Sequence, residues 1–204
     1  VKKQDKYTIR EELNYTSNDL ILGVMPGSRK NEILNLLPVF LETIKELSLI
    51  NPEIKFLLIV NELWLDFIKN NFQVSNLKII TSNSTYYMQS CDILLAASGT
   101  VTLEATILKI PIIACYKLTK VSYFFAKMLI KLDYFTLPNI IANQKVIGEF
   151  IQDNVNSKNL SVEILELLTN KELREDMINK FSLIEKEIEP KGSIKKLANL
   201  IISS

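Results

Sequence analysis

Four residues near the middle of the chain have the types and spacing of a nucleotide site. Ser98, Gly99 and Thr100 follow an apolar run, and Glu104 stands four residues after Thr100. At a helix N-terminus, a glycine and two hydroxyls can hold a diphosphate through backbone N–H groups and side-chain hydrogen bonds. A carboxylate one turn further on can accept two hydrogen bonds from a ribose diol. The alternative is an ordinary strand-to-helix turn with an acid near the positive end of the helix dipole. An acid among apolar neighbours needs a partner if it is buried, and this favours the nucleotide site.

The stretch "MPGSRKNE" at 25–32 is a second candidate for phosphate binding. Gly27 would let a ligand approach the backbone, and Ser28 could cap the helix that follows. The planar guanidinium of Arg29 suits phosphate oxygens, and Glu32 follows Arg29 at i+3. The spacing matches neither the P-loop nor the G-x-G-x-x-G pattern. A capped helix start with an exposed arginine is therefore the competing interpretation.

Two further segments carry weaker signals. Pro138-Asn139 interrupts a helical pattern within 134–152, and the Asn139 amide offers both donors and acceptors, although such a turn is more often structural. In 119–134, apolar and basic residues separate onto two faces, as in helices that lie on anionic membranes; an ordinary core-packed helix with solvated lysines is the alternative. The residues of that amphipathic pattern are Lys120, Val121, Phe124, Phe125, Lys127, Met128, Lys131 and Leu132.

The composition excludes several classes of chemistry. The chain has 204 residues and no histidine, which removes Ser-His-Asp and Cys-His catalysis and the commonest metal ligand. We therefore expect neither a metal site nor a cofactor. A net charge of +1 gives no support for nucleic-acid binding. Cys91 and Cys115 lie in apolar runs and are expected to be buried thiols. No apolar run approaches the roughly 18 to 20 residues that span a bilayer, and the polar start is unlike a signal peptide, so we expect a cytoplasmic location.

The elements that must position these residues alternate between apolar strands and helices. Such a pattern predicts an α/β fold, a Rossmann-like doubly wound parallel sheet with a helical C-terminal tail. We expect a lead-in at 1–18, a nucleotide-binding domain at 19–155 and the tail at 156–204. The predicted strands are 19–25, 54–60, 77–82, 91–97 and 111–116, and the predicted helices are 30–50, 62–72, 99–109, 119–131, 147–153, 158–169, 170–187 and 193–202.

In order and spacing, five stretches resemble the C-terminal half of the lipid-A-disaccharide synthase family, which are bacterial glycosyltransferases of the two-domain GT-B type. The resemblance covers about residues 10–155, and the helical tail is compatible with it. The stretches are "PGSRKNEI" (26–33), "SCDILLAASGTVTLEA" (90–105), "YK" (116–117), "LIKLDYFTLPNIIAN" (129–143) and "EFIQ" (149–152).

The resemblance implies a function as well as a fold. Members transfer 2,3-diacylglucosamine from its UDP donor to 2,3-diacylglucosamine 1-phosphate (lipid X) and release UDP. They need no metal, act at the cytoplasmic face of the inner membrane as peripheral proteins, and bind UDP in the C-terminal domain. Residues 81–84 follow the third strand, where such folds usually place the base of the nucleotide. Carried over by matching position, the UDP-binding residues are Ser28, Arg29, Ser98, Gly99, Thr100, Glu104 and Asn139.

The resemblance also leaves questions open. In this family an N-terminal domain binds the acceptor and supplies the general base, and this chain begins near the boundary between the domains. We therefore expect a donor-binding half, inactive without an acceptor domain, with no catalytic base assignable here. The tail leaves homodimerisation open, since in this family it can exchange between protomers. The alternatives are another UDP-N-acetylglucosamine-using enzyme of the same architecture, such as the peptidoglycan glucosaminyltransferase or a 2-epimerase, and a non-catalytic fragment.

Overall fold

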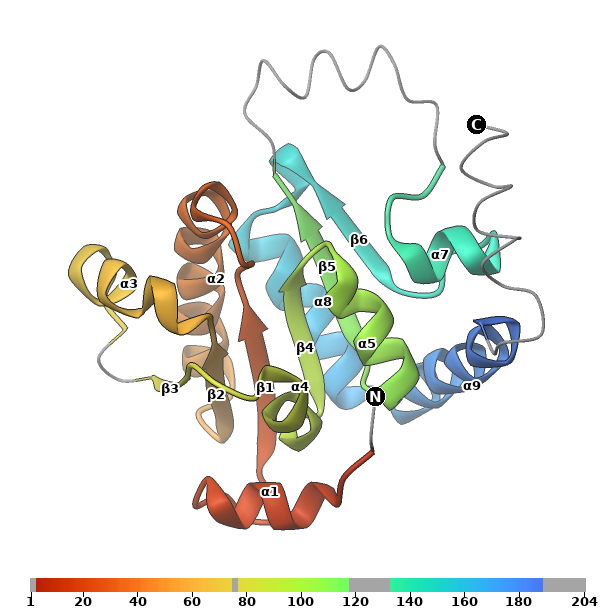
Figure 1. The fold of residues 1–204 in the computed structure, drawn as a ribbon, viewed down its shortest axis with the longest axis horizontal. Helices are drawn as coiled ribbons and strands as arrows, with labels where there is room; N and C mark the ends of the chain where they lie inside the picture. The colour runs from red at the N-terminus through yellow and green to blue at the C-terminus, as the bar shows by residue number, and fades with distance from the viewer. Residues whose placement is uncertain (1–2, 75–76, 118–132, 189–204) are drawn as a thin grey trace.

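The computed structural model describes residues 3–74, 77–117 and 133–188 (Figure 1). The expected helices at 119–131 and 193–202 lie outside these residues. So do the proposed membrane-surface residues Lys120, Phe124, Phe125, Lys127 and Lys131. The elements in chain order are α1 (Lys6–Glu12), β1 (Leu20–Met25), α2 (Lys30–Ile50), β2 (Ile54–Ile59), η1 (Glu62–Trp64), α3 (Leu65–Asn71), β3 (Lys78–Ile80), α4 (Ser84–Tyr87), η2 (Met88–Ser90), β4 (Ile93–Ala97), α5 (Thr100–Leu108), β5 (Ile112–Tyr116), α7 (Leu137–Ala142), β6 (Gly148–Ile151), η3 (Gln152–Asn154), α8 (Ser157–Thr169) and α9 (Lys171–Ile188).

The described strands form one parallel sheet in the order β3-β2-β1-β4-β5-β6. The chain moves outward from β1 to β3, returns to pair β4 with β1, and then moves outward on the other side. This reversal makes the sheet doubly wound, and it places a topological switch point between β1 and β4. The predicted α/β fold with a doubly wound parallel sheet is confirmed.

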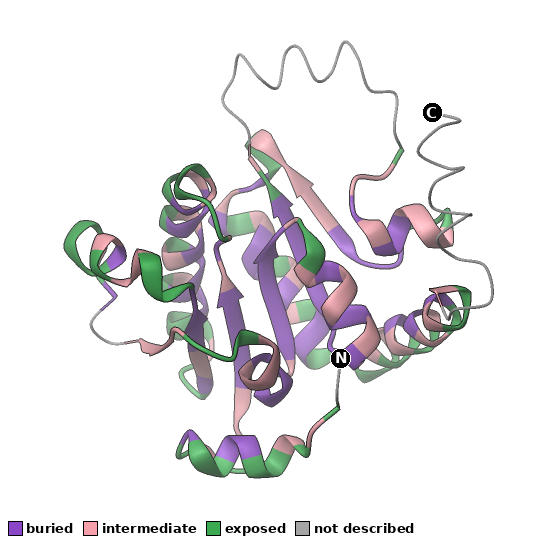
Figure 2. Ribbon diagram, in the orientation of Figure 1, coloured by how far each residue is buried: buried purple, intermediate pink, exposed green. Residues whose placement is uncertain are grey.

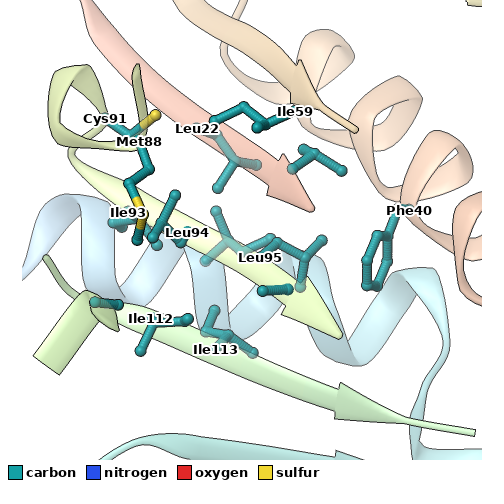
Figure 3. Close-up of a cluster of buried hydrophobic side chains, with 14 of the residues drawn as sticks. Leu22, Phe40, Ile59, Met88, Cys91, Ile93, Leu94, Leu95, Ile112 and Ile113 are labelled. Atoms are coloured by element: carbon teal, nitrogen blue, oxygen red, sulfur yellow. The ribbon is translucent and has the colours of Figure 1, made fainter. Parts of the chain in front are cut away.

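The central strands are buried because helices cover both faces of the sheet. Figure 1 shows α5 in front of the sheet and α8 behind it, and Figure 2 shows the central strands almost wholly buried. In Figure 3, apolar side chains of β1, β4 and β5 pack together, and Phe40 of α2 closes one end of the cluster. The described part of the tail belongs to the same core, through Leu160 of α8 and Phe181 of α9, both with 0% exposure.

One predicted element has the wrong type. Residues 147–153 were expected to be helical, but Gly148–Ile151 form β6, an edge strand that pairs with β5 from Ile113 to Tyr116. A short apolar stretch fits either period, and here the unpaired edge of β5 decides the conformation. Within β6, the Glu149 carboxylate accepts hydrogen bonds from the N–H and hydroxyl of Thr136, at 2.8 and 2.6 Å.

The lead-in at the start of the chain folds against the amino ends of β1 and β4. Arg10 of α1 has 3% side-chain exposure, and its guanidinium donates to Asp92 at 2.8 Å and to the carbonyl oxygens of Ser90 and Ser17. Lys6 pairs with the same carboxylate at 2.6 Å, and Asp92 also accepts from the Ile21 N–H. A buried guanidinium requires such partners, so α1 is attached to the sheet through Asp92. The proposed division at residue 18 stays a prediction.

Candidate functional site

A cavity of about 550 Å³ opens at the carboxyl ends of β1, β2 and β4. Its position is the switch point between β1 and β4, where doubly wound sheets bind ligands because two adjacent loops diverge there. The lining residues are Met25, Gly27, Ser28, Arg29, Glu32, Ile59, Val60, Asn61, Thr81, Ser82, Asn83, Ser84, Ala97, Ser98, Gly99, Thr100, Val101 and Glu104. Six of the seven predicted UDP-binding residues line this cavity. Residues 81–84, which were predicted to lie beside the base of the nucleotide, also line it.

The loop between β1 and α2 forms one side of the cavity. Gly27 has a φ of 113°, a conformation that side chains rarely adopt. The N-cap of α2 is Arg29 rather than Ser28. The Glu32 carboxylate accepts hydrogen bonds from the N–H groups of Ser28 and Arg29, at 2.9 and 3.2 Å. Across the loop, the Trp64 indole donates to the Ser28 carbonyl at 2.8 Å. The loop is therefore held from both sides.

Ser98, Gly99 and Thr100 form the opposite side of the cavity, between β4 and α5. The Ser98 N–H donates to the Cys115 carbonyl at 2.8 Å, which keeps the chain in sheet register up to the turn. Gly99 is the N-cap of α5 and has no side chain with which to cap the helix. Because the first N–H groups of a helix lack partners within it, this end can receive an anion. The structure therefore brings both predicted phosphate loops to the same cavity.

Glu104 lies one turn into α5 and is half-buried. Its Oε2 accepts the hydroxyl proton of Thr85, in α4, at 2.9 Å. Thr85 is the partner that an acid in this position was expected to need. The pair joins α5 to the segment that follows β3, and Glu104 lines the same cavity as the two predicted phosphate loops and residues 81–84.

Asn139 is the one predicted UDP-binding residue that does not line this cavity. It is fully buried in α7, and its side-chain oxygen accepts from the N–H groups of Val146 and Ile147, at 2.7 and 2.9 Å. Its side-chain nitrogen donates to the Ile147 carbonyl at 3.1 Å. These bonds hold the turn between α7 and β6, which is the structural alternative that the sequence left open.

Three residues around the cavity gain contacts that sequence analysis did not foresee. Trp64 was expected only as a residue of the helix at 62–72, and Thr85 was given no role. Glu32 was noted only for its i+3 spacing from Arg29; the structure shows an ion pair between the two at 3.2 Å and hydrogen bonds between Glu32 and the loop backbone. A tryptophan or threonine carries no local signal for a partner 36 or 19 residues away.

Residues 3–74, 77–117 and 133–188 together contain no group of three or more Cys, Asp or Glu side chains that could hold a metal ion. Within the same ranges no helix has both the length and the apolar character needed to cross a bilayer.

Comparisons with known proteins identify the family. A family model described as lipid-A-disaccharide synthetase matches residues 1–201. The lipid-A-disaccharide synthase of Alteromonas mediterranea is 40% identical over 169 residues, which is 79% of this chain and 44% of that protein. That of Nitrosococcus oceani is 37% identical over 186 residues, which is 89% of this chain and 48% of that protein. The chain thus spans about half the length of the curated relatives it matches.

Solved structures support the fold. A spinosyn rhamnosyltransferase complexed with thymidine diphosphate aligns with a TM-score of 0.56 at 11% identity, over 83% of this chain and 42% of that one. A UDP-GlcNAc 2-epimerase from Neisseria meningitidis bound to UDP-GlcNAc aligns with a TM-score of 0.54 at 17% identity, over 90% and 48%. Identities this low show a shared fold and nothing finer. On the match of the family model over residues 1–201, the chain belongs to the lipid-A-disaccharide synthetase family, a family of glycosyltransferases.

Proposed function

We propose that this chain is the donor-binding half of a lipid A disaccharide synthase. It would bind UDP-2,3-diacylglucosamine, whose sugar is transferred to lipid X with release of UDP. The observation that carries the proposal is the convergence of two phosphate-suited loops and Glu104 on one cavity at the switch point, in a member of this family.

The cavity suggests a role for each group. The N–H groups at the start of α5 and the hydroxyls of Ser98 and Thr100 would hold the diphosphate together with the loop of Ser28 and Arg29. Glu104 would accept the ribose hydroxyls, and residues 81–84 would lie beside the uracil. Because the proposed phosphate donors are backbone N–H groups, two hydroxyls and one guanidinium, we expect diphosphate binding to need no metal.

The transfer requires a group that this site does not supply. A hydroxyl of lipid X would attack the anomeric carbon of the donor, and the bond from that carbon to the UDP oxygen would break. The hydroxyl proton would pass to a general base on the acceptor side. We place that base in a separate acceptor-binding domain and expect the present chain to be inactive without it.

Location and assembly follow from the same proposal. Both substrates carry acyl chains, so the enzyme would work as a peripheral protein at the cytoplasmic face of the inner membrane. Residues 119–134 would contribute through their lysines and aromatic side chains. A homodimer through the C-terminal tail is part of the same proposal and would be tested by measuring mass in solution.

Thermal unfolding with UDP tests the proposal. A ligand at about 100 times its Kd adds about 2.7 kcal/mol of stability, which corresponds to a Tm shift of roughly 5 to 11 °C for a domain of this size. We expect this shift with UDP and a much smaller one for Glu104→Ala.

The matched control is Glu53→Ala, because Glu53 is exposed at the amino end of β2, away from the cavity. It should respond to UDP like the unmodified chain. A folded sample whose Tm does not move in millimolar UDP would refute the proposal.

A transfer assay tests the catalytic part of the proposal. Adding an intact acceptor domain to this chain should restore sugar transfer from the acylated donor, whereas unacylated UDP-N-acetylglucosamine should be a poor donor.

A further inference from the structure

The side chain of Glu32 occupies the donors of the β1–α2 loop. Its Oε2 accepts from the N–H groups of Ser28 and Arg29, at 2.9 and 3.2 Å, and its Oε1 lies 3.2 Å from the Arg29 guanidinium. Two backbone N–H groups and a guanidinium around one anion form the arrangement expected for a phosphate group. An internal carboxylate therefore stands where this loop would receive a phosphate.

The charges around the cavity prevent the Glu32 carboxylate and a ligand phosphate from occupying this loop together. Among the described lining residues, Arg29 is the cation, and Glu32 and Glu104 are the anions. A diphosphate next to the Glu32 carboxylate would be repelled, and the same N–H groups cannot donate fully to both. Binding at this loop thus requires Glu32 to leave.

The local backbone is suited to this arrangement. Gly27 has a φ of 113°, and a Cβ added there would lie 2.6 Å from the Cβ of Glu32, so only glycine lets Glu32 fold back over the loop. The Glu32 side chain is 22% exposed and that of Arg29 is 83% exposed. Rotation of either side chain toward solvent needs no movement of the sheet.

We propose that Glu32 is an internal competitor for the diphosphate. In the free protein its carboxylate holds the loop in its binding conformation, and the donor displaces it and takes over the N–H groups of Ser28 and Arg29. The inference rests on the proposed function, because it concerns the same diphosphate. It makes Glu32 a residue that weakens the binding of UDP, the product, and so favours its release.

A purely structural role for Glu32 makes a different prediction. Glu32 is the third residue of α2, where a side-chain acceptor commonly caps the N-terminal N–H groups. Glu32→Gln keeps an acceptor of the same size and removes the charge. A capping role therefore predicts equal or weaker UDP binding in this variant, whereas competition predicts tighter binding.

Isothermal titration calorimetry with UDP and with uridine separates the two. We expect Glu32→Gln to bind UDP about two- to fivefold more tightly, the range for one charge at a helix N-terminus. Uridine affinity should stay unchanged because uridine has no phosphate. Glu32→Ala should also bind UDP more tightly than the unmodified chain, despite a lower Tm. Glu53→Gln, at an exposed site, controls for the loss of one negative charge.

The outcomes are distinguishable. Unchanged or weaker UDP binding by folded Glu32→Gln would overturn the inference while leaving the proposed function intact. If neither the unmodified chain nor Glu32→Gln binds UDP, the proposed function fails and the inference with it. Tighter UDP binding by Glu32→Gln than by the unmodified chain, with unchanged uridine affinity, would confirm competition.

Discussion

The hydroxyl of Thr85 donates a hydrogen bond to Oε2 of Glu104, a residue that lines the cavity, at 2.9 Å. Thr85 belongs to α4, which follows β3, and Glu104 belongs to α5, which follows β4. The bond uses one carboxylate oxygen and leaves the other for a ligand. Thr85 is therefore a positioning residue for the group proposed to hold the ribose.

Removing this hydroxyl should weaken nucleoside binding without unfolding the protein. We expect Thr85→Val to lower the affinity for both UDP and uridine about three- to tenfold, since hydrogen bonds to charged groups contribute roughly 1.5 to 3 kcal/mol and part of this is recovered by water. Thr85→Ser keeps the hydroxyl and should bind like the unmodified chain. Calorimetric titration with uridine is the measurement. Equal affinities for the Val and Ser variants would mean that Thr85 does not orient Glu104.

A substitution at Gly99 should change the affinity for UDP without changing the stability of the fold. A Cβ built on Gly99 meets no atom within 4 Å, and its backbone is extended, so the folded state has room for alanine. Gly99→Ala should change the free energy of unfolding by less than about 1 kcal/mol, the scale of an N-cap effect. The methyl group would project into the space proposed for the diphosphate, and we expect UDP affinity to fall about tenfold or more while uridine affinity changes little. Undiminished UDP binding would place the phosphates elsewhere.

The sheet was predictable because its strands are continuous apolar runs. The first five strands, β1 to β5, fall within the predicted ranges, and α2 spans Lys30–Ile50 as its periodicity indicated. Helices on both faces force such runs, which makes them visible in a single sequence. β6 was not predictable in this way, because its four residues are too few for their pattern to distinguish a strand from a helix.

The site was predictable only as far as local chemistry defines it. The two loops of 26–29 and 98–100 carry their own turn residues, and the doubly wound topology requires their strands to be neighbours. Hydrogen bonds between residues far apart in the sequence were not predictable. The bonds from Trp64 to Ser28 and from Thr85 to Glu104 depend on how helices pack on the finished sheet, and no local spacing encodes them.

Asn139 should act on stability rather than on nucleotide binding. Replacing its buried amide by alanine leaves the N–H groups of Val146 and Ile147 and one carbonyl without their partner. We expect Asn139→Ala to lower the free energy of unfolding by about 2 to 4 kcal/mol in urea denaturation. Asn71→Ala, at an exposed position, should cost far less. A large loss of UDP affinity in Asn139→Ala at unchanged stability would restore Asn139 to the donor site.

The two buried thiols should make the protein sensitive to alkaline pH. Burial raises the pKa of the Cys91 thiol from 9.0 to about 12, and burial also raises the pKa of Cys115. Above pH 9 the unfolded thiols lose protons that the folded ones retain, so folding stability is full below that pH and falls as the pH rises toward 12. At pH 10 each thiol should lower the free energy of unfolding by roughly 1.4 kcal/mol relative to neutral pH.

Urea denaturation between pH 7 and pH 10 measures this loss. A variant with Cys91→Ala and Cys115→Ala should be less stable at pH 7, because each change leaves a cavity in the core. Its stability should nevertheless depend less on pH, since neither thiol remains to ionise on unfolding. Tyr15, whose pKa burial raises to about 12, contributes chiefly above pH 10 and is common to both proteins. Identical slopes in the two proteins would show that thiol ionisation is not the cause.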